Sequence, residues 1–311
     1  MTTWKKSLAA GVAAFLLGSG AAWAAELPAS EMAASVESLP AAPSGATYAE
    51  NTANAPMTLP LTEEQETELQ LAEAQRMALL WMRTSAEYRA LCYQGYNAAL
   101  AEIARVQANP AERSGKPLAI VLDCDETVVG NTRALAEAAA SGNGRYNSLW
   151  WRATISEAHS EAMPGAVDFL NEVARRGVAI FYVSNRWSEV NYEPTIENLK
   201  ALGFPSVDAE HVLLMEDRKM SDKQPRFDQI AKDYDVVVYM GDNAGDLPLG
   251  TKGMNRTARN AAIDAAQEEF GTQYIVFPNP AYGSWVGALA KDYMTMSPEA
   301  REEFYAKTLT E

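Results

Sequence analysis

The residues best suited to chemistry are aspartates that directly follow apolar segments of the chain. Asp123 and Asp125 come after the apolar run 117–122, in the order Asp-Cys-Asp. On one continuous strand, two carboxylates at this spacing would point to opposite faces. If the strand ends between them, both can approach one site, where the first can attack or bind a metal and the second can transfer a proton. Alone, such a pair is also typical of a solvated loop or a calcium site.

Two further apolar runs end in polar residues. Ser184 follows one of them, and Asp242 and Asp246 follow the other within Gly-Asp-Asn-Ala-Gly-Asp. Oxygen ligands without nitrogen favour Mg²⁺, which binds through one or two carboxylates, water and phosphate. Lys223 lies between these two runs in the sequence, and its point charge can bind a phosphoryl oxygen. A solvated helix face is the alternative interpretation of this lysine.

The apolar runs alternate with helical segments, which is the pattern of a parallel sheet covered on both faces. The expected strands are 117–122, 178–183, 211–214, 236–240 and 274–277, and the expected helices are 165–176, 189–202 and 225–233. The predicted fold class is therefore α/β, a Rossmann-like parallel sheet with helices on both faces. In such sheets ligands bind beyond the carboxyl ends of the strands, where the polar residues would meet.

The N-terminal region is predicted to direct export. Residues 1–24 have two lysines, a short apolar run and the small-residue cleavage pattern Ala22-Trp-Ala24, as in a signal peptide. An uncleaved N-terminal anchor is the alternative. Residues 25–60 are expected to form a flexible linker, and 61–110 to form one long or two shorter helices that begin with Thr62 as N-cap. The predicted protein is secreted, and a bacterial periplasm is its natural location.

Charge and residue counts exclude several functions. The 311 residues carry a formal charge of −15, so a nucleic-acid polymer, which needs basic patches, is not an expected partner. Two histidines are too few for a histidine-rich zinc site or a histidine phosphatase. Cys92 falls in an expected helix and Cys124 at a core strand. Two separate buried thiols are therefore favoured over the disulfide that export would permit.

Together these segments resemble the haloacid dehalogenase superfamily, whose four motifs occur here in the expected order. More narrowly, the chain is similar to the class C acid phosphatases, including the 5′-nucleotidase lipoproteins of bacterial outer membranes. The resemblance is carried by Leu122-Asp-x-Asp-Glu-Thr127, Met163-Pro-Gly-Ala-Val167, Phe181-Tyr-Val-Ser-Asn-Arg186, Ser221-Asp-Lys-Gln-Pro-Arg-Phe227 and Phe277-Pro-Asn-Pro-Ala-Tyr-Gly-Ser-Trp285. The lipoprotein members carry a lipobox cysteine that does not occur here, so no stable membrane anchor is expected.

The resemblance implies a phosphoric monoester hydrolase, of the acid phosphatase or 5′-nucleotidase type, with Mg²⁺ as cofactor. Asp123 would be the nucleophile that forms an aspartyl-phosphate. Asp125 would protonate the leaving oxygen and then deprotonate the attacking water. Asp123, Asp242 and the backbone carbonyl of Asp125 would bind Mg²⁺, and Asp246 would support the metal from close by.

The same resemblance implies how substrate would bind. Ser184 and Lys223 would bind phosphoryl oxygens. Tyr282 would stack on a nucleobase or another aromatic leaving group, and Trp150 or Trp151 would form the opposite wall. Core packing is the alternative for each of these aromatic side chains. The expected partner is a small phosphomonoester, with nucleoside 5′-monophosphates included.

The resemblance also divides the chain into parts. Residues 116–300 would form the catalytic core of haloacid dehalogenase-like fold, and an insertion at about 131–163 would form a helical cap together with 61–110. A lid of this kind would exclude water and provide specificity. Two alternatives stay open: a phosphotransferase using the same site, and a non-catalytic binding or storage protein on the same fold. A dehalogenase is disfavoured because it has little need for the acidic motif.

Overall fold

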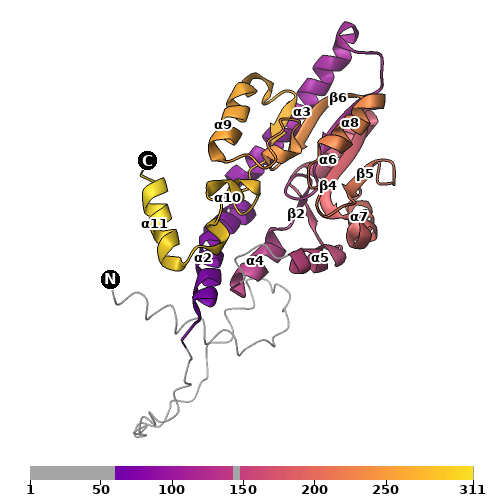
Figure 1. Ribbon diagram of the computed structural model, residues 1–311. Coiled ribbons are helices and arrows are strands. Elements are labelled where there is room, and N and C mark those ends of the chain that lie inside the picture. The colour runs from indigo at the N-terminus through magenta and orange to yellow at the C-terminus, as the bar shows by residue number, and fades with distance from the viewer. Residues whose placement is uncertain (1–59, 143–147, 311) are drawn as a thin grey trace, which may run out of the picture. The chain divides into compact units, whose positions relative to one another are not determined.

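Five parallel strands form the central sheet, in the order β5-β4-β1-β6-β7. Figure 1 labels β5, β4 and β6 of this sheet. They are β1 (Leu118–Leu122), β4 (Ala179–Trp187), β5 (Val212–Met215), β6 (Asp235–Gly241) and β7 (Tyr274–Val276). Each strand overlaps an apolar run from which it was predicted, so the α/β sheet is confirmed. Because β4 and β6 flank β1, the carboxyl ends of these three strands lie side by side.

The computed structural model describes residues 60–142 and 148–310. The predicted signal peptide 1–24 and nearly all of the predicted linker 25–60 lie outside the described residues. In the two described stretches, no helix combines the length and the apolar character needed to cross a bilayer.

The strands send apolar side chains to both faces of the sheet. In β1, Ile120 and Leu122 join one core cluster, and Val121 joins the other. The first face is covered by α3 (Ala86–Ala108), α6 (Ala166–Arg175) and α7 (Ser188–Ala201), and the second by α8 (Gln224–Asp233). A strand buried on both faces has to be apolar throughout. This is the physical reason why unbroken apolar runs identified these strands.

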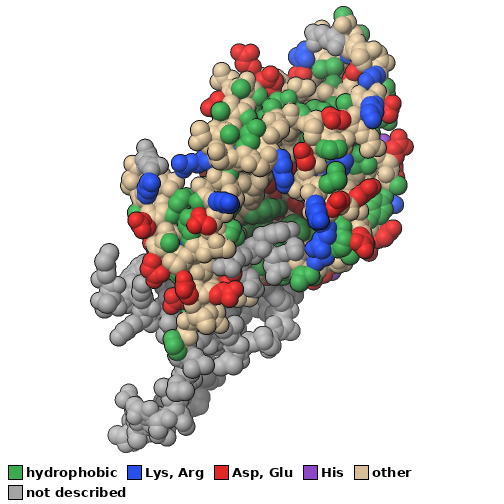
Figure 2. Space-filling view, viewed as in Figure 1, with side chains coloured by type: hydrophobic (Ala, Val, Ile, Leu, Met, Phe, Trp, Pro, Cys, Tyr) green, Lys and Arg blue, Asp and Glu red, His purple; other side chains and the backbone are tan. Residues whose placement is uncertain are grey.

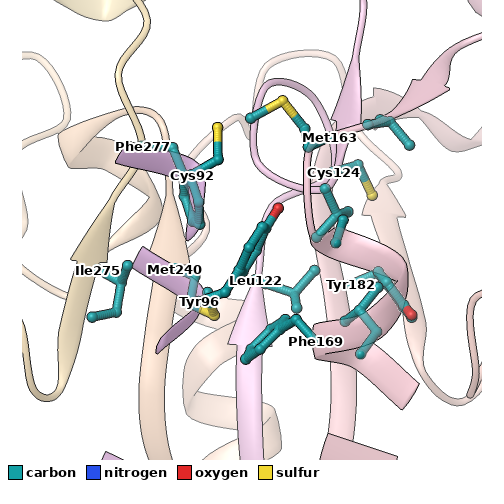
Figure 3. Packing of buried hydrophobic residues seen from close by; sticks show 14 of the residues in the cluster. Cys92, Tyr96, Leu122, Cys124, Met163, Phe169, Tyr182, Met240, Ile275 and Phe277 are labelled. Atoms are coloured by element: carbon teal, nitrogen blue, oxygen red, sulfur yellow. The ribbon is translucent and has the colours of Figure 1, made fainter. Parts of the chain in front are cut away.

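An aromatic group joins α3 to the loop that follows β1. The ring of Tyr96 lies between those of Phe169 and Phe277, with centroid distances of 4.8 Å to each (Figure 3). Its hydroxyl donates to the carbonyl of Thr127 at 2.6 Å. The loop that carries Asp123 and Asp125 is thus supported by the core beneath it.

Two helices precede the sheet, α2 (Glu63–Thr84) and α3. α2 begins at a capping box, in which the Gln65 N–H donates to Thr62 Oγ1 at 3.2 Å and the Thr62 N–H donates to Gln65 Oε1 at 2.9 Å. α2 packs against α4 (Thr132–Ala140), and α5 (Ser148–Ser156) packs against α7. Both α4 and α5 lie within the segment 131–163 for which a cap is predicted; the domain boundaries stay predictions.

Several short or C-terminal elements were not individually predicted from the sequence. These are the antiparallel pair β2 (Val129–Gly130) and β3 (Glu161–Ala162), the helices α9 (Arg256–Ala265), α10 (Ser284–Leu289) and α11 (Pro298–Thr308), and the 3₁₀ helices η2 (Pro110–Glu112), η3 (Ala244–Asp246), η4 (Gln267–Glu269) and η5 (Tyr293–Thr295). Arg301 fixes α11 in place, because this buried side chain donates to Gln70 Oε1 at 2.9 Å and to the Tyr293 carbonyl at 3.2 Å.

Cys92 and Cys124 are two separate thiols, as predicted, and both are fully buried. Figure 3 shows them among the core side chains. Burial raises the pKa of Cys92 to about 11 and that of Cys124 to about 12. Both thiols are therefore protonated and poorly nucleophilic at neutral pH.

Candidate active site

The polar residues that end β1, β4 and β6 meet in one cavity of about 500 Å³. Of the residues predicted from the sequence, those that line it are Asp123, Asp125, Ser184, Asp242, Asp246, Trp151 and Tyr282. Trp150 lines only a neighbouring cavity of about 720 Å³, which shares Trp151 and Tyr282 with the first. The sheet edge thus brings together residues that are more than 150 positions apart in the sequence.

Three carboxylates form a close acidic group, Asp123, Asp242 and Asp246, with one oxygen from each lying within 4.8 Å of the others. The Asp123 N–H donates to the Met240 carbonyl at 2.9 Å, which ties the end of β1 to β6. Asp242 directly follows β6, and its Oδ2 accepts from Asn279 Nδ2 at 2.7 Å. The bond to Met240 positions the backbone of Asp123, and the bond from Asn279 positions the side chain of Asp242.

Asp246 reaches the group through a tight turn. Its Oδ2 accepts from the Asn243 N–H at 2.9 Å. A Cβ at position 241 would lie 2.2 Å from the Asp246 Cβ, which no real pair of atoms tolerates. Gly241 is therefore required so that the Asp246 side chain can fold back over the end of β6.

Lys223 supplies the positive charge nearest to this group. It directly precedes α8, and its Nζ lies 2.8 Å from Asp123 Oδ1 and 2.7 Å from Asp246 Oδ1. Its side chain is only 2% exposed. Burial works to lower the pKa of Lys223, but the two carboxylates outweigh it and raise the pKa above its ordinary value. Lys223 is therefore a fixed cation.

One lysine does not balance three carboxylates. Burial raises the pKa of Asp123 to about 6; Lys223 opposes this rise, and Asp246 and Asp125 add to it. Burial, together with Asp246 and Asp123, raises the pKa of Asp242 well above its ordinary value. Asp123 and Asp242 are partly buried and Asp246 is buried. Carboxylates with excess negative charge and only oxygen donors suit a hard divalent cation. The residues present therefore fit the predicted Mg²⁺.

Asp125 lies in a different electrostatic setting. Arg186 donates to both oxygens of the Asp125 carboxylate, from Nε to Oδ2 at 3.0 Å and from Nη2 to Oδ1 at 2.7 Å. Asn131 Nδ2 also donates to Oδ1, at 2.8 Å. Arg186 Nη1 also donates to Thr195 Oγ1 of α7 at 3.1 Å. Arg186 and Asp125 therefore form a buried ion pair.

Ser184 lies at the bend where β4 passes the site. It is buried and lines the cavity, and its Oγ accepts from the Arg186 N–H at 3.2 Å. Arg226 braces this bend, because its Nη1 donates to the Ser184 carbonyl at 2.7 Å and its Nη2 to Asn185 Oδ1 at 2.6 Å. The Ser184 hydroxyl proton is thus free to point into the cavity.

Aromatic side chains form the wall shared by the two cavities. The rings of Trp151 and Tyr282 have centroids 5.9 Å apart. The Tyr282 hydroxyl donates to Glu126 Oε2, and Glu126 Oε1 accepts from the Asn131 N–H at 2.6 Å. Burial, with a contribution from Asp125, raises the pKa of Glu126 to about 7. Glu126 thus connects the nucleophile loop to the aromatic wall.

Comparison with known proteins decides the family. Residues 44–285 match the family described as HAD superfamily, subfamily IIIB (Acid phosphatase). The chain belongs to this family. The resemblance inferred from the motifs and the haloacid dehalogenase-like fold are thereby confirmed, and the chain is a phosphoric monoester hydrolase.

Two solved structures of class C acid phosphatase from Bacillus anthracis are similar to this acid phosphatase. One is 36% identical, with a TM-score of 0.68, and the match covers 76% of this chain and 97% of that chain. The other, described with tungstate bound, is 35% identical, with a TM-score of 0.68 and coverage of 78% and 97%.

Some residues of this phosphatase site escaped prediction from the sequence. Asn279, which donates to Asp242, lies in a Pro-Asn-Pro segment that carries part of the family resemblance, but the motif itself does not indicate a contact with Asp242. Arg259 of α9 lines the cavity and donates from Nη2 to Asn243 Oδ1 at 3.2 Å. No sequence signal marked Arg259, because an arginine within a helix has the pattern of a solvated side chain.

Proposed function

We propose that the chain is an exported, Mg²⁺-dependent phosphomonoesterase that acts through an aspartyl-phosphate and accepts nucleoside 5′-monophosphates. One observation carries this proposal. Asp123 lies at the end of the central strand, in the cavity, within reach of Lys223 and of two further carboxylates. This arrangement combines a nucleophile, a cation for a phosphoryl oxygen and an oxygen-only ligand set in one place.

Mg²⁺ would be held by Asp123, Asp242 and the backbone carbonyl of Asp125, with Asp246 in support. When bound, it neutralises phosphoryl charge so that an anionic nucleophile can approach an anionic substrate. The excess of negative charge in the acidic group supports this assignment. The structure described with tungstate bound supports the phosphate-binding part of the proposal, because tungstate is a tetrahedral oxyanion like phosphate.

The side chains divide the reaction into two displacements. In the first, an Asp123 oxygen bonds to phosphorus, the bond from phosphorus to the leaving oxygen breaks, and that oxygen takes a proton from Asp125. In the second, Asp125 takes a proton from water, the water oxygen bonds to phosphorus, and the Asp123 carboxylate is released. Ser184 and Lys223 hold phosphoryl oxygens, and the bidentate contact with Arg186 keeps Asp125 in one orientation.

The aromatic wall supports a preference for leaving groups with flat rings. Trp151 and Tyr282 border both cavities, so a ring bound beside the phosphoryl site would contact them. Stacking of a base on an aromatic side chain contributes about 1–3 kcal/mol. Export is proposed from the signal-like residues 1–24, and sequencing the N-terminus of protein recovered from a bacterial periplasm would test it.

The catalytic proposal is tested by assaying p-nitrophenyl phosphate and AMP with Mg²⁺ and with EDTA. We expect EDTA to abolish turnover and Mg²⁺ to restore it. Asp123→Asn should lower kcat by at least about 10³-fold, since it removes the nucleophile. Asp168→Asn makes the same chemical change at an exposed position of α6 and should leave kcat unchanged. Near wild-type turnover by Asp123→Asn would rule out the aspartyl-phosphate.

A further inference from the structure

The active-site cavity continues past the acidic group to a second set of polar groups. Arg259, Thr251, Lys252 and Ser284 line this part, and they come from α9, the loop before it and the start of α10. The mechanism proposed above uses none of these side chains. The cavity of about 500 Å³ has the volume of roughly 17 water molecules at about 30 Å³ each, so it has room for more than one phosphoryl group.

Arg259 is the central observation. Arg259 is 8% exposed, and its guanidinium donates a neutral hydrogen bond from Nη2 to Asn243 Oδ1. In the part of the chain that the structure describes, no carboxylate forms an ion pair with it. Burial lowers the pKa of this guanidinium, and the negative charge of Asp246 opposes the shift. A buried cation without a counterion is costly, so its position favours an anionic ligand.

Two neighbouring groups point to the same kind of ligand. Thr251 is 1% exposed, and its Oγ1 has no hydrogen-bond partner among residues 60–142 and 148–310. The Lys252 ammonium reaches across to the Ser221 hydroxyl at the cavity rim. A buried hydroxyl without a partner is rare. Guanidinium, ammonium and hydroxyl groups together are the donors that bind phosphate.

The reacting phosphoryl group does not account for these donors, because Ser184 of β4 and Lys223, which directly precedes α8, are already proposed to bind it. Figure 2 shows Lys and Arg side chains around a hollow on this face of the molecule. The 26 Lys and Arg residues are outnumbered by 41 Asp and Glu residues, so the positive potential around the hollow is a local feature of an acidic chain.

We propose that Arg259, Thr251 and Lys252 form a second phosphate subsite, so that the phosphatase favours substrates carrying two phosphate groups, such as nucleoside bisphosphates. The expected preference in turnover rests on the proposed function, whereas the expected preference in binding does not. Arg259 bonds the distal phosphate, Thr251 lines the subsite beside it, and Lys252 completes the rim. The distal phosphate thereby gives Arg259 the counterion that it lacks.

Binding is measured first, by calorimetry, with AMP and adenosine 3′,5′-bisphosphate as probes and Asp123→Asn as the protein, so that turnover cannot interfere. We expect the bisphosphate to bind on the order of tenfold more tightly, which corresponds to about one charge-assisted hydrogen bond. Arg259→Met should abolish this preference, and Arg259→Lys should retain part of it. Arg256→Met removes the same charge from an exposed position of α9 and should leave the preference intact.

Steady-state kinetics on the wild-type chain with Mg²⁺ then separate the two proposals. A binding preference without turnover of either compound supports the subsite and contradicts the phosphatase proposal. Equal affinity for the two probes overturns the subsite. If Arg259→Met lowers kcat/KM equally for both, Arg259 acts on the reacting phosphoryl group, and the subsite is also overturned.

Two further arms complete the experiment. Lys252→Met, at an exposed position, should lower the preference for the bisphosphate over AMP several-fold. This variant replaces Arg259→Met as the test if Arg259→Met does not fold. Inorganic phosphate is titrated into protein saturated with AMP. One outcome is that inorganic phosphate binds in an Arg259-dependent way while AMP and the bisphosphate bind with equal affinity. In that outcome the subsite holds free phosphate, and the proposal that it binds the second phosphate of a substrate is overturned.

Discussion

Replacing Arg186 with methionine tests whether the buried guanidinium holds Asp125 in place. The side chains of Arg186 and Asp125 are 1% and 12% exposed and form two hydrogen bonds, at 2.7 and 3.0 Å. Removing one partner of such a pair leaves a buried charge without compensation and costs about 3–5 kcal/mol. We therefore expect Arg186→Met to lower the free energy of unfolding by about that amount.

The assay is urea unfolding followed by tryptophan fluorescence, with the double-mutant cycle Arg186→Met and Asp125→Asn. The matched control is the surface pair Arg133–Glu137, whose side chains are 68% and 70% exposed. For an exposed pair at this spacing on a helix we expect a coupling energy of about 0.3–0.5 kcal/mol, against more than about 2 kcal/mol for the buried pair. A coupling for Arg186 and Asp125 no larger than that of the control would refute the reasoning.

Three other changes give distinct outcomes. Gly241→Ala places a Cβ 2.2 Å from that of Asp246 and should weaken Mg²⁺ activation by about tenfold or more. Gly245→Ala is the control, because the nearest atom to its added Cβ lies at 3.9 Å, and it should leave Mg²⁺ activation unchanged. Titration of activity against Mg²⁺ measures both. The pKa of Asp123 is raised from 3.8 to about 6, so the folded metal-free state binds more protons than the unfolded state and loses stability as pH rises through this range. The gain in Tm from Mg²⁺ over EDTA should therefore be larger at about pH 7.5 than at about pH 5, and a gain that does not vary with pH would contradict this. Tyr282→Ala should lower kcat/KM for AMP about ten- to hundredfold more than for glycerol phosphate, and an equal loss for both would show that the ring only packs.

The sheet could be predicted because its strands are short, apolar and buried on both faces. The run 178–183 predicted β4, although the strand continues to Trp187 through polar residues. That extension depends on pairing of Trp187 with Met215 of β5, a contact between distant segments that local periodicity does not encode. The short helix α10 begins after Gly283 and has too few residues for a helical period to be detected.

The types of residue in the site could be predicted from the sequence, but the contacts between their side chains could not. Strand ends placed Asp123 and Asp242 at one edge, because parallel strands share a direction. The sequence could not show that Arg186 pairs with Asp125, because the two residues are 61 positions apart and pair only where the fold buries both side chains together. Arg259 was missed for a similar reason: only the packing of α9 against the cavity removes its side chain from solvent.

The buried thiol of Cys124 gives the nucleophile loop a built-in reporter. This thiol lies between Asp123 and Asp125 and is fully covered, so iodoacetamide can reach it only when the loop opens. Cys92, on α3 in the same core, provides an internal reference. Alkylation that is faster at Cys124 than at Cys92 measures local opening, and equal rates measure global unfolding. The motions of this loop can therefore be timed in the natural sequence by mass spectrometry, without an introduced label.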